Sequence, residues 1–362
     1  MSTRGMRLVC MFRNFQAIIV EAESSTISRG IQITVKHKKG SAGAALMSRQ
    51  RDQDGGGSET ITVREVPQFK VENFVLMAEF DDGDESYRQK AENELRETPE
   101  VVQQALKDIR VLVQGEPNFA VPDDDEFFQK FLRPCKWYPK SAFQLMTRFY
   151  RFRVNNPQYC ADLVPSTEKK ALLSEMVIPL PERTTQGRRV LLVHLGKRWN
   201  PKVITINDTF RAVALSLEAA MAEPKTQIAG VHVIIDLNGF SVSHATHITP
   251  SFAMALTEFV QKCLPCRLKG IHLVNNPFIF NMVFALFKPF LSEKMRKRII
   301  FHGTDKKSLM SHVSANCIPT EFGGDFEIPK VPLGQGIYEY FYWFEKDFEI
   351  ANKYGYSAQA KS

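Results

Sequence analysis

Beyond Leu172 the chain alternates between short apolar runs and helical patterns, and this alternation constrains the fold more than any other feature. The apolar runs have the length of buried strands and lie at residues 189–195, 230–236, 270–275 and 298–303. Helical patterns lie between them, at roughly 208–222, 250–264 and 277–290. Strands that alternate with helices predict parallel βαβ units. The expected fold is therefore α/β, with a mostly parallel sheet covered by helices.

The region before this domain has apolar side chains at helical spacing. Thr98-Pro99 resembles a helix start, and the acidic run Asp123–Asp125 would favour the positive N-terminal end of a second helix. Ser141 could cap a third helix. We therefore predict a small helical module at residues 86–155, ahead of the α/β domain at residues 156–330.

The two ends of the chain differ from this body. Residues 1–85 include the polar, Gly- and Ser-rich stretch HKKGSAGAALMSRQRDQDGGGSE, which predicts a disordered or irregular extension. Within it, the segment ITVREV at residues 61–66 could be ordered but has no evident partner strand. Residues 331–362 form a C-terminal aromatic tail, IYEYFYWFEKDFEI, which could bind a partner.

The net charge of +7 is unevenly distributed. Residues 78–130 carry 15 acidic and 6 basic side chains, whereas residues 131–362 carry 30 basic and 18 acidic ones. A basic body is typical of proteins that meet an anionic surface, either nucleic acid or anionic lipid. No basic–aromatic RNA motif, capped recognition helix or zinc finger is visible, so we expect a lipid surface and no nucleic acid.

The α/β pattern carries no recognisable catalytic or metal-binding motif. Asp236 ends a predicted strand, but no nucleophile elbow or phosphate-binding loop accompanies it, and a turn role is favoured. Cys263 and Cys266 form an isolated C-x-x-C that nothing completes, so we interpret them as ordinary thiols rather than a redox pair or half a zinc site. His244 and His247 are better explained as surface or capping histidines. We predict no catalytic residue, cofactor or metal. The six scattered cysteines also favour a reducing, cytosolic compartment.

An uncharged apolar stretch is followed directly by a cluster of positive charge in residues 270–298, GIHLVNNPFIFNMVFALFKPFLSEKMRKR. No acidic or basic residue occurs from Gly270 to Phe287, and five basic residues follow by Arg298. Pro277 interrupts the run, so it cannot form one membrane-spanning helix. The helix after Pro277 is either a fully buried core helix or a lid with one face on an internal ligand and the other on lipid. The apolar pattern alone does not separate the two.

Two pairs of cations flank this helix. Arg267 and Lys269 are two residues apart in an extended segment, so their side chains point the same way. Lys294 and Arg298 are four apart in a helical segment and also share a face. An apolar helix beside cations that share a face favours contact with an anionic membrane.

From about residue 87 to 328 the sequence resembles the CRAL-TRIO lipid-binding family. The resemblance rests on FFQKFLRPCKWYPKSAFQLMTRFYRFR, GVHVIIDLNGFSVSHATHITPS, LKGIHLVNNPFIFNMVFALFKPFLSEKMRKRIIFHG and IPTEFGG. Within the family, the chain is most similar to the group that includes the tocopherol carrier and clavesin, and EKMRKRI looks most like clavesin. The resemblance implies one hydrophobic lipid, tocopherol-, retinoid- or phospholipid-like, in a pocket under a mobile lid at roughly 275–290. It also implies a basic cleft for phosphatidylinositol bisphosphate.

Aligning these motifs carries the family's site residues onto this chain. The implied cleft residues are Arg267, Lys269, Lys294, Arg298 and Arg133. The implied pocket residues are Phe210, Val213, Leu217, Val231, Val233, Ile235, Ile279, Phe280, Val283 and Leu286. Val213 and Leu217 stand where the tocopherol carrier has serines, which indicates a drier pocket or another lipid.

The resemblance thus implies a non-enzymatic, monomeric lipid carrier in the cytoplasm, associated peripherally with endosomal or other phosphoinositide-containing membranes. The alternative is a phosphoinositide-binding trafficking adaptor with no dedicated cargo. In that case the acidic region and the aromatic tail would bind a protein partner.

Overall fold

The computed structural model describes the backbone of residues 6–12, 16–22, 34–37, 45–51 and 59–356, and the side chains from Val66 onward. The chain divides into two compact units, Met1–Pro67 and Gln68–Ser362. The strands of the first unit are β1 (Met6–Phe12), β2 (Gln16–Ala22), β3 (Thr34–His37), β4 (Ala45–Arg51) and β5 (Glu59–Glu65). The first three form one antiparallel sheet, and β4 pairs with β5. The expectation of an irregular extension is therefore wrong for these segments, and ITVREV has a partner strand in β4.

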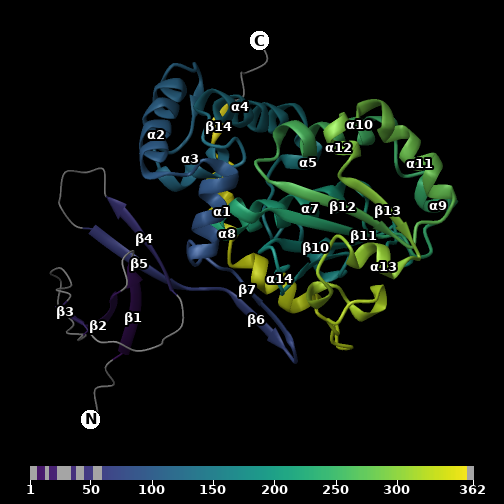
Figure 1. Ribbon diagram of the computed structural model, residues 1–362, viewed down its shortest axis with the longest axis horizontal. Helices are drawn as coiled ribbons and strands as arrows, with labels where there is room; N and C mark the ends of the chain where they lie inside the picture. Colours follow the sequence, from purple (N-terminus) through teal and green to yellow (C-terminus); the bar gives the residue numbers. More distant parts are fainter. Residues whose placement is uncertain (1–5, 13–15, 23–33, 38–44, 52–58, 357–362) are drawn as a thin grey trace. The chain divides into compact units, whose positions relative to one another are not determined.

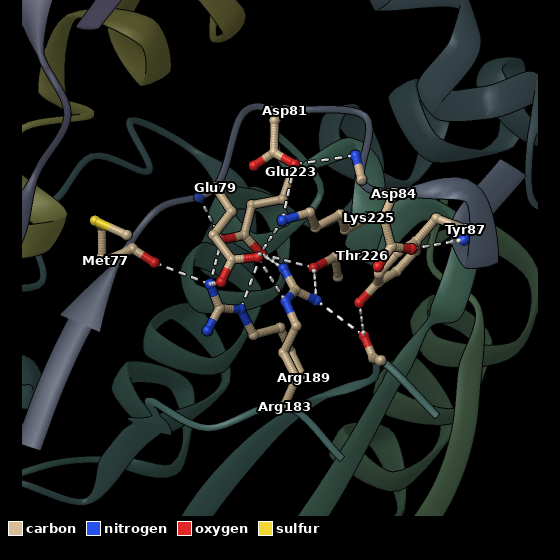
Figure 2. Close-up of polar contacts among 12 residues, drawn as sticks. Met77, Glu79, Asp81, Asp84, Tyr87, Arg183, Arg189, Glu223, Lys225 and Thr226 are labelled. Carbon is tan, nitrogen blue, oxygen red and sulfur yellow. Dashed lines mark hydrogen bonds and ion pairs between the residues drawn. The ribbon is translucent and has the colours of Figure 1, made fainter. Parts of the chain in front are cut away.

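The second unit begins earlier than the sequence predicted, with a hairpin of β6 (Gln68–Val71) and β7 (Phe74–Met77). Phe74 is fully buried, and its ring packs against those of Phe69 and Phe326. The segment that follows is tied to the body by polar contacts of Glu79 with Arg183 and Glu223 (Figure 2). Residues 68–85 thus belong to the folded body, because the hairpin buries one face and the following segment is ion-paired.

The predicted helical module is present. Its helices are α1 (Glu85–Leu95), α2 (Pro99–Gln114), α3 (Asp125–Leu132), α4 (Pro139–Asn155) and α5 (Pro157–Cys160). Thr98 caps α2 and Asp124 caps α3, as the sequence indicated. Helix α4 begins at Pro139, ahead of the expected cap Ser141, because proline at the first helical position already has the required φ.

A five-stranded sheet in the order β13-β12-β11-β10-β9 forms the centre of the body (Figure 1). Its strands are β9 (Val177–Leu180), β10 (Arg189–His194), β11 (Val231–Asp236), β12 (Leu268–Val274) and β13 (Ile299–Gly303). Strands β10 to β13 are parallel and β9 is antiparallel to β10, which confirms the predicted mostly parallel sheet.

Helices connect these strands and place the site. They are α6 (Lys169–Leu173), α7 (Ile206–Ala220), α8 (Pro224–Ala229), α9 (Val242–Ala245), α10 (Pro250–Glu258) with the π-helical η1 (Phe259–Cys263), α11 (Ile279–Phe287), α12 (Glu293–Arg296) and α13 (Lys306–Met310). In Figure 1, α9 and α11 lie towards one end of the sheet, and α1 to α3 lie towards the other. Among the described residues, every helix is too short or too polar to cross a lipid bilayer.

The C-terminal segment completes the core. It forms α14 (Gly334–Tyr342), α15 (Glu345–Ala351) and β14 (Gly355–Tyr356), and β14 pairs with β8 (Phe119–Ala120). Ile337, Phe341, Phe344 and Phe348 are buried. The aromatic tail is therefore largely internal, which corrects its interpretation as a surface for a partner. Its aromatic side chains cover the chain's own apolar surface.

Candidate functional site

Helix α11 has two different faces, although its sequence is apolar all round. Phe280 and Val283 are buried, and Ile279 and Leu286 are half-buried. On the other side, Phe278, which precedes the helix, is 82% exposed and Met282 is 65% exposed. A helix with such exposed residues is not a fully buried core helix. Its arrangement matches the lid alternative.

The inner face of α11 rests on an apolar strip of the sheet. The ring of Phe301 on β13 lies 4.8 Å from that of Phe284 and 6.4 Å from that of Phe280, between centroids. The strand register places further apolar side chains on the same sheet face, and each is partly exposed: Ile235, Ile271 and Ile299. Helix α11 therefore covers part of an apolar surface that extends beyond it.

The segment that leads into α11 begins at a polar network at the carboxyl ends of β10 to β12. Asn275 has a left-handed φ of 52°, and its Nδ2 donates to Asp236 Oδ1 at 2.8 Å. His194 Nδ1 donates to Asp236 Oδ2 at 3.1 Å. Burial opposes ionisation of Asp236, but the hydrogen bonds from His194 and Asn275 outweigh it and hold the pKa of Asp236 below its ordinary value. Asp236 thus fixes the residue from which the segment leading into α11 starts, a role beyond the turn that the sequence suggested.

The predicted pocket residues fall into separate groups. Four of them lie on α11, and Val231, Val233 and Ile235 share one face of β11. Val213 is half-buried on α7, and Leu217 on the same helix lines a cavity of about 30 Å³ together with Val231. A cavity of this size holds about one water molecule, so it is too small for a lipid. Phe210 packs instead in an aromatic cluster, with its ring 4.4 Å from that of Tyr159.

Three of the five predicted cleft cations lie together, beside the amino ends of β12 and β13. Arg267 Nη2 lies 2.6 Å and Lys269 Nζ 3.2 Å from Glu94 Oε2 of α1. Burial lowers the pKa of Arg298, and the neighbouring charge of Arg267 lowers it further. Gly230 permits this packing, because its φ is 91° and a Cβ there would lie 2.2 Å from the Arg267 carbonyl oxygen.

The other two predicted cations are placed differently. Lys294 is exposed on α12, one helical turn before Arg298. Arg133 is only 5% exposed, and its guanidinium is bonded to Glu97 at 2.8 Å and to Gln227 at 2.7 Å. Arg133 therefore holds α8 and the start of α2 together and offers no exposed charge.

Sequence reasoning missed Arg188 and a row of buried histidines on the sheet face opposite the apolar strip. Arg188 Nη1 donates to His232 Nε2 at 2.9 Å, so His232 carries its proton on Nδ1 and donates it to His272 Nε2 at 2.9 Å. His272 Nδ1 in turn donates to His302 Nε2 at 3.0 Å. One arginine thus sets the tautomer of each imidazole in the row. The sequence signal that could have revealed this row was the presence of one histidine in each of three predicted strands.

Two further sequence interpretations can be placed. Burial raises the pKa of the Cys263 and Cys266 thiols to about 12, the opposite of what a reactive thiolate requires. His244 Nδ1 accepts a hydrogen bond from the Ser241 backbone N–H at 3.0 Å, and this capping role agrees with the sequence interpretation.

Comparison with known proteins places the chain. The solved structure named "Crystal structure of Sfh5" aligns with a TM-score of 0.42 at 15% identity, over 74% of this chain and 98% of that one. The alpha-tocopherol transfer protein-like protein of Mus musculus is 36% identical over 236 residues, which are 65% of this chain and 68% of that protein. Clavesin-1 of Rattus norvegicus is 34% identical over 249 residues, 68% of this chain and 70% of that protein. Residues 173–324 match the CRAL/TRIO domain. By the matches to the CRAL/TRIO domain and to these two relatives, which are lipid-binding proteins rather than enzymes, the chain belongs to the CRAL/TRIO family.

Proposed function

We propose that this protein is a non-enzymatic carrier that holds a hydrophobic lipid beneath α11 and releases it at membranes containing phosphatidylinositol bisphosphate. The observation that carries the proposal is the path of the β12–β13 crossover. It starts at Asn275, passes through α11 over the apolar strip, and ends at Arg298 beside Arg267. One continuous segment thus links the lid to the cationic cleft.

Uptake in this proposal needs only apolar surface and no catalytic group. Removing apolar area from water is favourable by roughly 25 cal/mol per Å². Because the cavity beside Leu217 and Val231 is only about 30 Å³, we expect a lipid to enter by outward movement of α11 over the strip. The cargo class is tocopherol-, retinoid- or phospholipid-like, and the printed name of the mouse relative, alpha-tocopherol transfer protein-like, supports a transfer role.

Release would follow from contact of both the cleft and the lid with a membrane. Each basic residue near an anionic surface contributes about 1 kcal/mol. In this proposal the membrane would also contact the exposed side chains Phe278 and Met282, at the other end of the β12–β13 crossover, and would stabilise an open lid there. The carrier would act as a monomer in the cytoplasm, with peripheral association at endosomal or other phosphoinositide-containing membranes.

The cleft is tested by the double variant Arg267→Ala/Lys269→Ala. Loss of two cations near the membrane should weaken binding to phosphatidylinositol bisphosphate vesicles roughly thirtyfold, because two contacts of about 1 kcal/mol are removed. Vesicle flotation measures the binding. The control is Lys306→Ala/Lys307→Ala, which removes two exposed charges from α13. Equal losses in the two double variants would contradict a specific cleft.

The outer face of the lid is tested by Phe278→Ser/Met282→Ser. Both side chains are apolar, so their loss should weaken vesicle binding about tenfold or more. Both are also exposed to solvent, so the substitutions should leave folding intact. The matched control is Val111→Ser on α2, where an equally exposed apolar residue lies on a different helix (68% exposed). If Val111→Ser weakens binding as much as the lid variant, α11 is not the membrane-facing element.

The cavity of about 30 Å³ beside Leu217 and Val231, which is too small for a lipid, favours the second candidate, a phosphoinositide-binding trafficking adaptor without cargo. The two candidates differ in a single measurable property, the presence of a bound lipid. The buried aromatic tail leaves the adaptor fewer side chains with which to bind a partner.

A further inference from the structure

The cationic cleft already contains an anion supplied by the chain itself. Glu94 of α1 places one carboxylate oxygen, Oε2, against both Arg267 and Lys269, at 2.6 and 3.2 Å. The side chains of Arg267 and Lys269 are 13% and 19% exposed, whereas that of Glu94 is 42% exposed. The carboxylate thus lies on the solvent side of the cations, where an incoming headgroup would arrive.

More cations than these two surround Glu94. The negative charge of Glu94 acts on Arg188 and Lys90 as well, and the positive charge of Arg267 acts on both. Arg188 is held by the neutral ring of His232, and Lys90 donates to the backbone carbonyl of Gln186. Both hydrogen-bond partners are uncharged, so these two cations add positive charge to the cleft. Arg298 adds a further charge beside Arg267.

The backbone of α1 at Glu94 is held in place by neighbouring residues of the helix, independently of the Glu94 side chain. Helix α1 packs against α8, and Leu95 and Ala91 of α1 are buried. Arg267 also donates from Nη1 to the carbonyl of Ile228 on α8, so its guanidinium stays in position when the carboxylate moves away. Displacement of Glu94 therefore requires only a side-chain rotation, and the cations remain arranged to receive another anion.

The charge of the incoming group decides whether this exchange is favourable. A phosphodiester headgroup carries one negative charge, the same as the Glu94 carboxylate that it would replace. A phosphate monoester carries about −1.5 to −2 at neutral pH and offers three strong acceptor oxygens. Arginine and lysine side chains arranged around one point bind such a group with short, charge-assisted hydrogen bonds.

We propose that Glu94 is a specificity-determining residue of the cleft, because it excludes singly charged phospholipid headgroups and yields to phosphate monoesters. Arg188 and Lys90 are additional ligands of the monoester in this arrangement. The inference rests on the proposed function, since it concerns the same cleft. It adds a selection step that the family resemblance did not imply.

The test is vesicle flotation with the full chain and the variant Glu94→Gln. Three vesicle types are compared, namely phosphatidylcholine with phosphatidylserine, with phosphatidylinositol, or with phosphatidylinositol bisphosphate. We expect Glu94→Gln to bind the first two about tenfold more tightly than the unmodified chain, with a smaller gain for the bisphosphate, so that selectivity falls. The control is Glu92→Gln, the same charge change at an exposed position of α1.

The possible outcomes separate the two proposals. If the unmodified chain fails to bind bisphosphate vesicles, the proposed function of the cleft is wrong. If it binds them and Glu94→Gln keeps its selectivity, or changes binding to the three vesicle types as Glu92→Gln does, only the role of Glu94 is wrong. Glu94→Asp provides a second variant that keeps the charge but draws it back by one methylene. We expect its selectivity for bisphosphate vesicles to lie between that of the unmodified chain and that of Glu94→Gln.

Discussion

Replacing Glu223 by glutamine should lower the free energy of unfolding by about 3–5 kcal/mol, the range expected when one partner of a buried ion pair is removed. Glu223 is 2% exposed, and its carboxylate is surrounded by donors (Figure 2). These donors are Nε and Nη2 of Arg189, Nη2 of Arg183, the Thr226 hydroxyl and the Glu79 backbone N–H. Burial opposes its ionisation, but the charge of Arg189 outweighs this and holds the pKa of Glu223 below its ordinary value.

The size of the effect follows from what the carboxylate joins. It connects the segment after β7 to β10 and α8, so its neutralisation leaves two arginines in a buried site with less compensating charge. The control is Asp81→Asn in the same network, where an aspartate that is 63% exposed pairs with Lys225 at 2.8 Å. An exposed pair contributes at most about 1 kcal/mol. Urea unfolding measures both variants, and equal losses would contradict the described network.

Acidification from pH 7 to pH 5 should lower the free energy of unfolding by about 2 kcal/mol for each of His232 and His272, because between pH 6.5 and pH 5 only the unfolded chain protonates them and each pH unit in that interval costs about 1.36 kcal/mol. Burial lowers the pKa of His232 from 6.5 to about 4 and that of His272 from 6.5 to about 3. Between pH 6.5 and these values, the unfolded chain binds protons that the folded chain does not. The contribution of these two histidines to stability is therefore fully present above pH 6.5 and falls as the pH is lowered towards their folded-state pKa values.

The histidine row also gives a structural reason for this sensitivity. Each Nε2 in the row accepts a hydrogen bond from the preceding group, so a proton added there would place two donors face to face. The variant His272→Gln should be less stable at pH 7 but should lose about 2 kcal/mol less on going to pH 5. The control His247→Gln makes the same substitution at an exposed histidine outside the row. If His272→Gln keeps the full pH dependence, the row is not its source.

The sequence predicted the elements of the body because their patterns are local. Apolar runs, Thr98-Pro99 and the acids before α3 determine strands and helix starts within a few residues. Side chains alternate along an extended segment, so the sequence also predicted that Arg267 and Lys269 point the same way, and in the fold both reach Glu94. The two faces of α11 could not be predicted, because an apolar helix has the same pattern whether both faces or only one is covered.

The missed features depend on contacts between distant segments. Glu94 lies 173 residues from Arg267, and no spacing rule relates them. The hairpin β6–β7 was missed because each strand has only four residues, and its burial depends on α14 and Phe326. The reason for a glycine at position 270 is evident only in the fold. A Cβ there would lie 2.5 Å from His272 Nε2 and break the histidine row.

The most direct test of a carrier is the lipid content of the purified protein before and after it meets vesicles. Organic extraction and mass spectrometry should find roughly one lipid molecule per protein, since the proposed site beneath α11 would bury a single ligand. We expect that lipid to be lost to vesicles containing phosphatidylinositol bisphosphate and retained with phosphatidylcholine vesicles. A protein without lipid, even after incubation with a mixed lipid extract, or one that loses lipid equally to both vesicles, would contradict a lidded carrier controlled by its cationic cleft.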